Sequence, residues 1–252
     1  MLLLRSTFTL CTAAALCSAG VAMAQPATET PWGVGLGASI KQKAYAGMGT
    51  STTVIPLLSY ENRWIRFAGP LLDVKLPTQA PVSVTLRARY AFEDGYDASD
   101  APVLSGMADR KSSVWLGASV LWRSGVADLG AEWLADASGH SKGQRLRLAA
   151  EKSWRMGSFT LAPRLAVQWN DRKSVDYYYG VRTGEARAGR PAYSARASTH
   201  TELGLRTAYA WAPQHSMYLD LSATRLGSAV TASPLVDRST ETALRLGYLY
   251  RF

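Results

Sequence analysis

Cysteine, histidine and long apolar runs are the scarce features of this 252-residue chain. The two cysteines, Cys11 and Cys17, both lie close to the N-terminus, so disulfides, thiolate metal sites and cysteine nucleophiles are excluded from the rest of the chain. The three histidines are His140, His200 and His215, and none has another histidine or a carboxylate at metal-ligand spacing. We therefore expect no cofactor, no metal and no enzymatic activity.

One catalytic alternative depends on geometry that a sequence does not give. Asp136, His140 and Ser141 lie close enough along the chain to form a hydrolase relay if the fold brings the three side chains together. No other feature supports such a relay. We expect the histidines to be ordinary surface or loop residues.

Long apolar runs are also missing beyond the N-terminal segment. No later window has about 20 consecutive apolar residues, so a membrane-spanning helix is excluded there. The N-terminal segment has a basic start at Arg5, an uncharged stretch over residues 9–22, and the small-residue pattern Ala22-Met23-Ala24. This order is typical of a secretory signal peptide. We predict that residues 1–24 are the signal peptide, cut after Ala24, and that residues 25–252 form one domain.

The positive charge does not indicate a nucleic-acid binder. The formal net charge is +9, but lysine and arginine are spread along alternating segments and are not gathered on one helix or tail. An exported chain also has no access to nucleic acid. We expect anionic neighbours, such as lipopolysaccharide phosphates in the surrounding outer-membrane lipid, acidic polymers or anionic solutes.

Apolar and polar residues alternate with a period of two in segment after segment, which places one set on each face of a strand. The clearest segments are residues 81–92, 113–123, 127–133, 145–154, 159–169, 203–211, 217–223 and 242–252. Soluble strands average about five or six residues, whereas these run to about eleven, as in membrane barrels. The last strand ends on Phe252, which resembles the signature read by the barrel assembly machinery. The pattern predicts an all-β, antiparallel transmembrane β-barrel in the bacterial outer membrane.

Loop lengths predict the orientation and the strand number. Short turns near Gly125, Gly157 and Pro213 alternate with long connections, and bacterial barrels place short turns in the periplasm and long loops outside. Such barrels need an even strand count. Splitting residues 64–76 at Gly69-Pro70 gives about twelve strands, and ten is the fallback. Pro163 removes a ladder donor, and we expect a local bulge there.

Amphipathic aromatic residues should form two rings where the barrel wall meets the two membrane surfaces. With the short turns in the periplasm, the periplasmic ring contains Trp122, Trp154, Phe159, Trp211, Tyr248 and Phe252. The outer ring contains Tyr90, Phe92, Trp133 and Trp169.

The face of the strands turned away from lipid is rich in charge. The predicted lumen lining contains Arg87, Arg89, Arg145, Arg147, Arg164, Arg206 and Arg245, accompanied by Arg123 and by the carboxylates Glu132, Asp136, Glu151, Glu202, Asp220 and Glu241. The charges line a channel, or they form an ion network that plugs the lumen. About twelve strands lie between the filled eight-stranded barrel and the open sixteen-stranded pore, so both interpretations stay open.

The longest loop, over residues 170–198, is rich in tyrosine. Its candidate interaction residues are Tyr177, Tyr178, Tyr179, Arg190 and Tyr193. Tyrosine supplies contact area at low entropy cost, and arginine adds directional hydrogen bonds. The loop either recognises a partner, or folds into the lumen, or packs on its own rim.

Several stretches carry a family resemblance. They are Ile55-Pro56-Leu57-Leu58-Ser59-Tyr60-Glu61-Asn62-Arg63-Trp64, the Gly69-Pro70 pair followed by Asp73-Val74-Lys75-Leu76-Pro77, and Tyr178-Tyr179-Gly180-Val181. Together they resemble the MipA/OmpV family, the MltA-interacting proteins of the outer membrane, over essentially the whole exported chain. The resemblance implies a scaffold that links a lytic transglycosylase to a peptidoglycan synthase, a penicillin-binding protein. Other family members are described as porin-like or as stress-response proteins, so the alternative is a channel for small polar or anionic solutes. The family motifs imply no catalytic residue.

Overall fold

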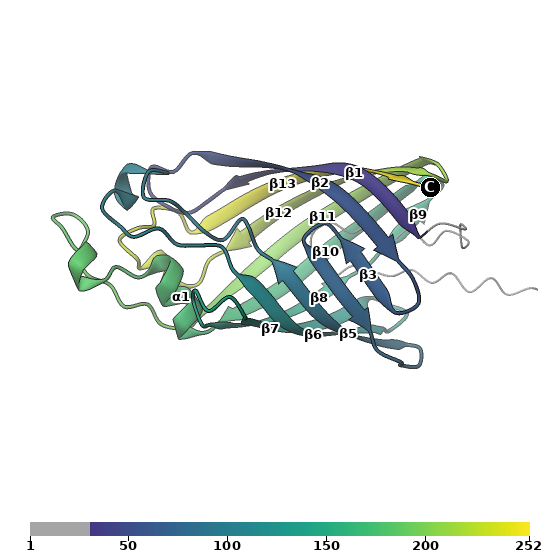
Figure 1. Cartoon of the computed structure of the whole chain (residues 1–252), viewed down its shortest axis with the longest axis horizontal. Coiled ribbons are helices and arrows are strands. Elements are labelled where there is room, and N and C mark those ends of the chain that lie inside the picture. The colour runs from purple at the N-terminus through teal and green to yellow at the C-terminus, as the bar shows by residue number, and fades with distance from the viewer. Residues whose placement is uncertain (1–30) are drawn as a thin grey trace, which may run out of the picture.

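The protein is a closed antiparallel β-barrel, seen here in a computed structural model that describes residues 31–252 (Figure 1). The predicted signal peptide, residues 1–24, lies outside the described residues. Strands that follow one another in the sequence pair, except that β8 and β9 both pair with β10, and the first strand, β1, pairs with the last, β13, to close the barrel. The strands are β1 (Trp32–Gln42), β2 (Thr50–Glu61), β3 (Ile65–Ala68), β4 (Leu71–Lys75), β5 (Val82–Tyr90), β6 (Val114–Arg123), β7 (Asp128–Asp136), β8 (Gln144–Glu151), β9 (Trp154–Met156), β10 (Phe159–Asn170), β11 (Ser198–Ala212), β12 (His215–Arg225) and β13 (Thr240–Arg251).

The prediction of twelve strands is confirmed. The segment containing Gly69-Pro70 is a hairpin of the short strands β3 and β4, in which Ala68 pairs with Leu71. β8 and β9 are two parts of one barrel strand, because both pair with β10 in the same register.

The expected bulge at Pro163 is wrong. β10 keeps an unbroken register with β11 through this residue. The proline instead affects the pairing of β10 with its other neighbouring strand, which consists of β8 and β9. Lys152 N donates to Pro163 O at 3.3 Å, but Pro163 has no N–H with which to donate back to Lys152 O. The ladder therefore breaks at this point, between β8 and β9. A register shift of the kind that a β-bulge causes occurs instead in the pairing of β11 with β12, between Ala210 and Ala212 of β11.

The short turns and the C-terminus lie at one end of the barrel, and the long loops lie at the other (Figure 1). Large aromatic side chains point outward near both ends. Trp122 and Trp211 are 48% and 46% exposed toward the turn end, and Trp133 is 46% exposed toward the loop end. This arrangement is the pair of interfacial rings that bacterial outer-membrane barrels show, and it places the short turns in the periplasm.

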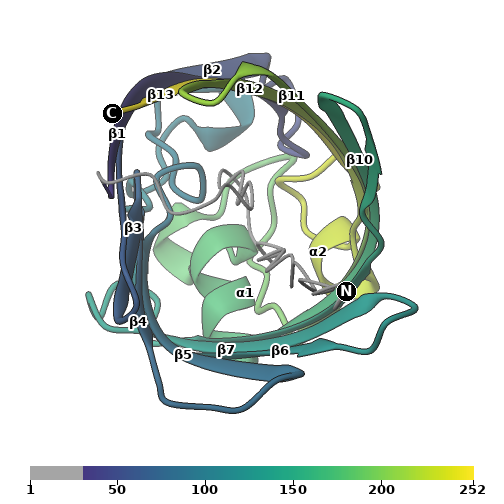
Figure 2. The ribbon, with the colours of Figure 1, turned by 90° about the vertical axis from the view of Figure 1, so that its right-hand side faces the viewer.

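The long loops carry four short helical segments. They are α1 (Arg172–Tyr179), α2 (Ser228–Thr231) and the 3₁₀ turns η1 (Pro102–Leu104) and η2 (Thr183–Glu185). Figure 2 shows α1 and α2 inside the outline of the barrel when the molecule is viewed from the turn end. None of the helices within residues 31–252 is long and apolar enough to cross a membrane.

Candidate functional site

One buried charge cluster joins β4, β5 and β7 inside the barrel. Arg87 donates from Nε and Nη2 to the two carboxylate oxygens of Asp73 at 2.7 and 2.8 Å, and it also donates to Glu132. Arg89 Nη2 donates to the same Glu132 at 2.8 Å. Asp73, Arg87 and Glu132 are each less than a tenth exposed. Bidentate pairing fixes the arginine fork and satisfies charges that would be costly to bury alone.

A second cluster joins β8, β10, β11 and β12. Asp220 is fully buried and accepts from Arg206 Nε at 3.0 Å and from Arg164 at 3.3 Å. Glu202 accepts from Arg164 Nε at 2.9 Å and from both terminal nitrogens of Arg147 at 2.9 and 3.1 Å. The inner wall at this level is therefore a connected ion network.

Two further arginines hold the segment that follows β5 against the wall. Arg145 Nη1 lies 2.6 Å from Asp94 Oδ2, and its guanidinium stacks 3.9 Å above the centre of the buried Trp115 ring. Arg245 Nη2 donates to Glu93 Oε2 at 2.9 Å. All seven arginines predicted for the lumen thus lie on the inner wall, and each has a carboxylate partner.

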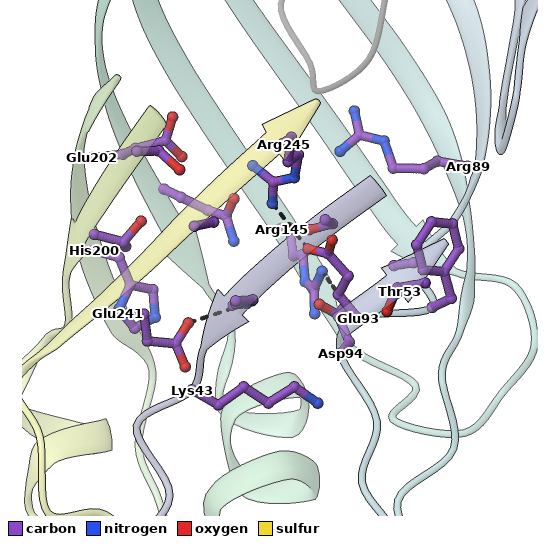
Figure 3. Close-up of a pocket in the computed structure, with 18 of the residues that line it drawn as sticks. Lys43, Thr53, Arg89, Glu93, Asp94, Arg145, His200, Glu202, Glu241 and Arg245 are labelled. Carbon is purple, nitrogen blue, oxygen red and sulfur yellow. Dashed lines mark hydrogen bonds and ion pairs between the residues drawn. The ribbon is translucent and has the colours of Figure 1, made fainter. Parts of the chain in front are cut away.

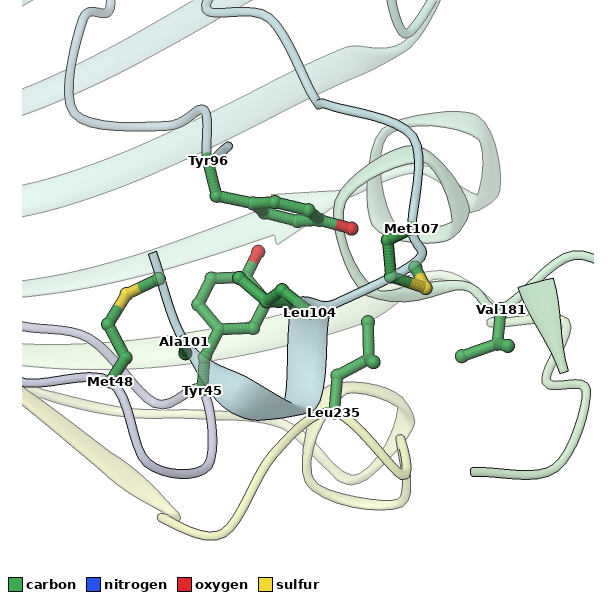
Figure 4. Packing of buried hydrophobic residues seen from close by; sticks show 8 residues of the cluster. All are labelled: Tyr45, Met48, Tyr96, Ala101, Leu104, Met107, Val181 and Leu235. Carbon is green, nitrogen blue, oxygen red and sulfur yellow. The ribbon is translucent and has the colours of Figure 1, made fainter. Parts of the chain in front are cut away.

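The outer mouth of the barrel is covered by a lid, which we define as residues 43–49, 91–113, 171–197 and 226–239. Its buried apolar core contains Tyr45, Met48, Tyr96, Ala101, Leu104, Met107, Val181 and Leu235 (Figure 4). These residues come from four different loops. Packing of this kind makes the outer loops one body that lies over the lumen.

The tyrosine-rich loop folds inward and forms part of this lid. Tyr178 is 4% exposed, and its carbonyl accepts from the Tyr45 hydroxyl at 3.0 Å. The ring of Tyr179 stacks on that of Tyr45, with centroids 5.4 Å apart. Tyr177 accepts through its carbonyl from Arg110 Nε at 2.7 Å. Of the arrangements that the sequence left open for this loop, the structure therefore shows the one in which the loop folds into the barrel.

The end of the same loop is tied to its neighbours. Arg190 is 3% exposed and donates to the carbonyls of Ser105 and Glu185 at 2.9 and 2.6 Å. The Tyr193 hydroxyl donates to Ala229 O at 2.8 Å, which joins the loop to α2. The polar groups of Arg190 and Tyr193 thus bind other segments of the lid.

An ion pair that the sequence analysis did not find crosses the lid. Arg110 Nη2 donates to both carboxylate oxygens of Glu185 at 3.0 and 2.9 Å. Burial acts to raise the pKa of Glu185, but the hydrogen bonds from Arg110 and from the backbone of Arg182 and Ala108 outweigh it and lower the pKa to about 2. No spacing rule relates two residues in different loops, so only the fold identifies this pair.

A cavity of about 300 Å³ lies between the charge clusters and the lid (Figure 3). Its polar lining contains seven basic and four acidic side chains: Lys41, Lys43, Arg89, Arg145, Arg147, Arg164 and Arg245, with Glu93, Asp94, Glu202 and Glu241. Five of the seven predicted lumen arginines therefore line the cavity. Arg87 and Arg206 belong to the ion clusters outside it. Sequence reasoning missed Lys43, Glu93 and Asp94, which lie just beyond the strand ends.

The possible Asp136–His140–Ser141 relay does not form. Ser141 Oγ donates to Asp136 Oδ2 at 2.8 Å, but His140 Nδ1 contacts the Ser112 carbonyl at 2.9 Å and Ser138 Oγ at 3.3 Å. The histidine therefore does not lie between the serine and the aspartate. Asp136 instead caps the loop by accepting from the backbone amides of Ser138, Ser141 and Lys142. No cluster of three metal-ligating side chains occurs within residues 31–252.

The family model of the MltA-interacting protein MipA matches residues 34–252, which is nearly the whole described barrel. The chain belongs to the MipA family. Among the relatives of this MipA-family protein is the MltA-interacting protein of Escherichia coli (strain K12), 29% identical over 238 residues, covering 93% of this chain and 94% of that protein. The putative outer membrane protein YiaT of the same organism is 25% identical, covering 90% and 93%. Outer membrane protein OmpV of Vibrio cholerae serotype O1 is 27% identical, covering 62% and 61%.

Solved outer-membrane barrels are among the structures to which this chain is similar. The NanC porin is 14% identical with a TM-score of 0.43, covering 88% of this chain and 100% of that one. An outer membrane channel from Pseudomonas putida F1 is 15% identical with a TM-score of 0.44, covering 90% and 97%. The family and the fold together place this protein in the bacterial outer membrane.

Proposed function

We propose that this MipA-family barrel is a non-enzymatic scaffold that docks a lytic transglycosylase on its periplasmic face and brings it to a peptidoglycan synthase, a penicillin-binding protein. The observation that carries the proposal is the closed lumen. The outer mouth is covered by a lid with its own buried core, and the arginines of the inner wall are held by carboxylates. A barrel filled in this way is suited to be a rigid platform.

The name of the Escherichia coli relative, MltA-interacting protein, supports the same partner class for this chain. Murein enzymes act on the periplasmic side of the outer membrane, so the docking surface must include the short turns. Val126, in the turn between β6 and β7, is 79% exposed. Met156, at the end of β9, is 58% exposed. Apolar side chains held at a turn tip are suited to be anchors for a protein partner.

The proposal is tested by surface-immobilised binding. The barrel in nanodiscs is exposed to a purified lytic transglycosylase, and an unrelated outer-membrane barrel gives the background. We expect specific binding that weakens about tenfold in Val126→Asp, because a charge replaces an apolar contact. The matched control is Ala188→Asp, an exposed change in the outer lid. Binding no stronger than to the unrelated barrel overturns the proposal.

A diffusion channel for small polar or anionic solutes is the second candidate. It is favoured by the excess of basic over acidic side chains around the cavity, which suits an anion. The lid and the ion clusters oppose it, since a solute would have to displace both. Ion conductance separates the two candidates.

A further inference from the structure

One stretch of the barrel wall lacks a backbone partner. β2 pairs with β1 along its whole length, but its other edge pairs with β3 only at Ser59, Tyr60 and Glu61. One more bond, from Gly69 N to Leu58 O at 3.0 Å, ends this ladder. Within the part of the chain that the structure describes, no backbone hydrogen bond leaves this edge of β2 along residues 50–57.

The gap exists because the β3–β4 hairpin is short. The hairpin turns at Gly69-Pro70, and Pro70 O accepts from Tyr90 N, the last residue of β5, at 3.0 Å. Beyond the turn, the backbone of the next segment bonds on the β6 side, where Ala91 N donates to Ser113 O at 3.0 Å, and within residues 31–252 it forms no backbone bond to β2. The wall on the loop side of the hairpin therefore consists of the β2 edge and residues 90–93, which are not joined by backbone bonds.

The sequence of β2 is suited to an open edge. The alternation of the ladder directs the N–H groups of residues 58 and 62 toward β3, so position 56 faces the same way. That position is Pro56, which has no N–H, and proline within sheets is confined to edges. An unpaired edge at membrane depth is tolerated only where it is covered by protein or lines a water-filled cavity. Thr53 and Ile55 of β2 line the lumen cavity, so the open edge of β2 borders a cavity, as the second of these conditions requires.

The cavity is apolar on the β2 and hairpin side of the gap, where Ile55, Pro70 and Leu71 line it, and Leu71 is 3% exposed. Glu93 lines the other side of the gap, and the lining farther in is mainly basic. Elsewhere at this level the inner wall carries the charged side chains already described. The lid closes the way in from outside, so the gap is the opening that faces lipid.

The cationic part of the cavity has donors without a carboxylate partner. Lys43 is 7% exposed and donates to Gly95 O at 2.6 Å, and it forms no ion pair with any described carboxylate. Figure 3 shows its side chain lying below Arg145, Glu93 and Asp94. The Nε atoms of Arg145 and Arg147 are buried and lack an acceptor within residues 31–252. Burial and the nearby charge of Lys41 lower the pKa of Lys43, and a bound anion would oppose both effects.

We propose that the gap between β2 and residues 90–93 is a lateral portal, through which an amphipathic anion enters the lumen cavity from the outer leaflet. Its apolar chain lies against Ile55, Pro70 and Leu71. Its carboxylate or phosphate head binds Lys43 and Arg145. This inference concerns a different surface from the periplasmic docking face and stands or falls independently of the scaffold role.

The portal is tested by cysteine labelling in lipid nanodiscs, in a Cys11→Ser, Cys17→Ser background. Ile55→Cys lies on the inner wall beside the gap, and Leu249→Cys is a half-buried inner-wall control on β13 that does not line the cavity. Each is labelled with bilayer-partitioned N-pyrenylmaleimide and with a membrane-impermeant anionic maleimide. We expect the ratio of lipid-borne to water-borne labelling to be about tenfold higher at Ile55→Cys. Equal ratios overturn the portal, and so does protection of Ile55→Cys that grows with protein concentration, since a second chain then covers the edge. If Ile55→Cys does not fold, as judged by heat-modifiable migration, Thr53→Cys replaces it.

The ligand class is tested by asking whether an added amphiphile protects Ile55→Cys from maleimide labelling. Dodecanoate is the probe for a free amphiphile, and lipid A is the probe for a phosphorylated membrane lipid. Protection by either supports the amphipathic-anion site and identifies its source, whereas protection by neither overturns it. We expect Lys43→Met to raise the half-protecting concentration about tenfold, because a charge-assisted hydrogen bond is lost. Lys111→Met, on the exposed outer lid, is the matched control, and an equal effect of both substitutions contradicts the assignment of Lys43.

Discussion

Arg110 and Glu185 pair across the outer mouth of the barrel, with Nη2 of the arginine 2.9 Å from Oε2 of the glutamate. The first residue belongs to the β5–β6 loop and the second to the β10–β11 loop. Together with the apolar core below them, they join two loops that are 75 residues apart in sequence into one lid.

Acid should loosen this lid. The pKa of Glu185 is lowered from 4.5 to about 2. The ion pair therefore stabilises the lid fully at any pH above the ordinary glutamate pKa of 4.5. This stabilisation is lost as the pH falls from about 4.5 through 2. We expect the protection of amides in residues 171–197, taken as the intrinsic exchange rate relative to the observed rate at the same pH, to fall over that range. In Glu185→Gln this protection should already be lower at pH 7 and should change less with acid. An identical acid response in Glu185→Gln would show that another group controls the lid.

Asp220 should be a stabilising centre of the ion network. Its carboxylate is fully buried against Arg164 and Arg206, and removing one partner leaves buried charge without compensation. We expect Asp220→Asn to lower the free energy of unfolding in lipid by about 3 kcal/mol, measured by urea titration. Asp237→Asn removes an exposed carboxylate 3.8 Å from Arg238, and it should change the free energy of unfolding by less than about 0.5 kcal/mol. Equal effects of the two substitutions would mean that the network contributes little.

Pro163 should be the cause of the break between β8 and β9. In Pro163→Ala the new amide faces Lys152 O, and we expect it to be protected from exchange and to stabilise the barrel by about 1 kcal/mol. Pro56→Ala is a matched control because its new amide faces the open edge of β2. Both substitutions change the unfolded chain alike. A protected amide at position 56 would contradict the open edge, and an unprotected one at position 163 would contradict the explanation of the break.

The sequence predicts the barrel well because its strongest signal is local. Alternation with a period of two and the short turns give the strands, and Gly69-Pro70 gives the twelfth strand. Pro163 shows the limit of such reasoning: the sequence identifies a missing donor, but the strand that faces that donor decides where the ladder breaks. The inward fold of the tyrosine-rich loop depends on contacts such as that of Tyr178 with Tyr45, which is 133 residues away. Local patterns carry no signal for such pairs.

The site residues divide in the same way. Seven arginines on the inner wall follow from alternation alone. Lys43, Glu93 and Asp94 lie just beyond strand ends, where alternation no longer determines direction, and Arg110 and Glu185 lie in loops. The sequence therefore predicts the charged wall but not whether the lumen is closed.

The most direct test of the closed barrel is ion conductance in a planar bilayer, comparing the refolded wild type with Arg145→Ala/Arg147→Ala. A barrel closed by the lid and by its ion network, as a scaffold would be, predicts no steady conductance from the wild type. Steady wild-type conductance, with an anion preference that falls in the double variant, would contradict this account and make the protein a channel.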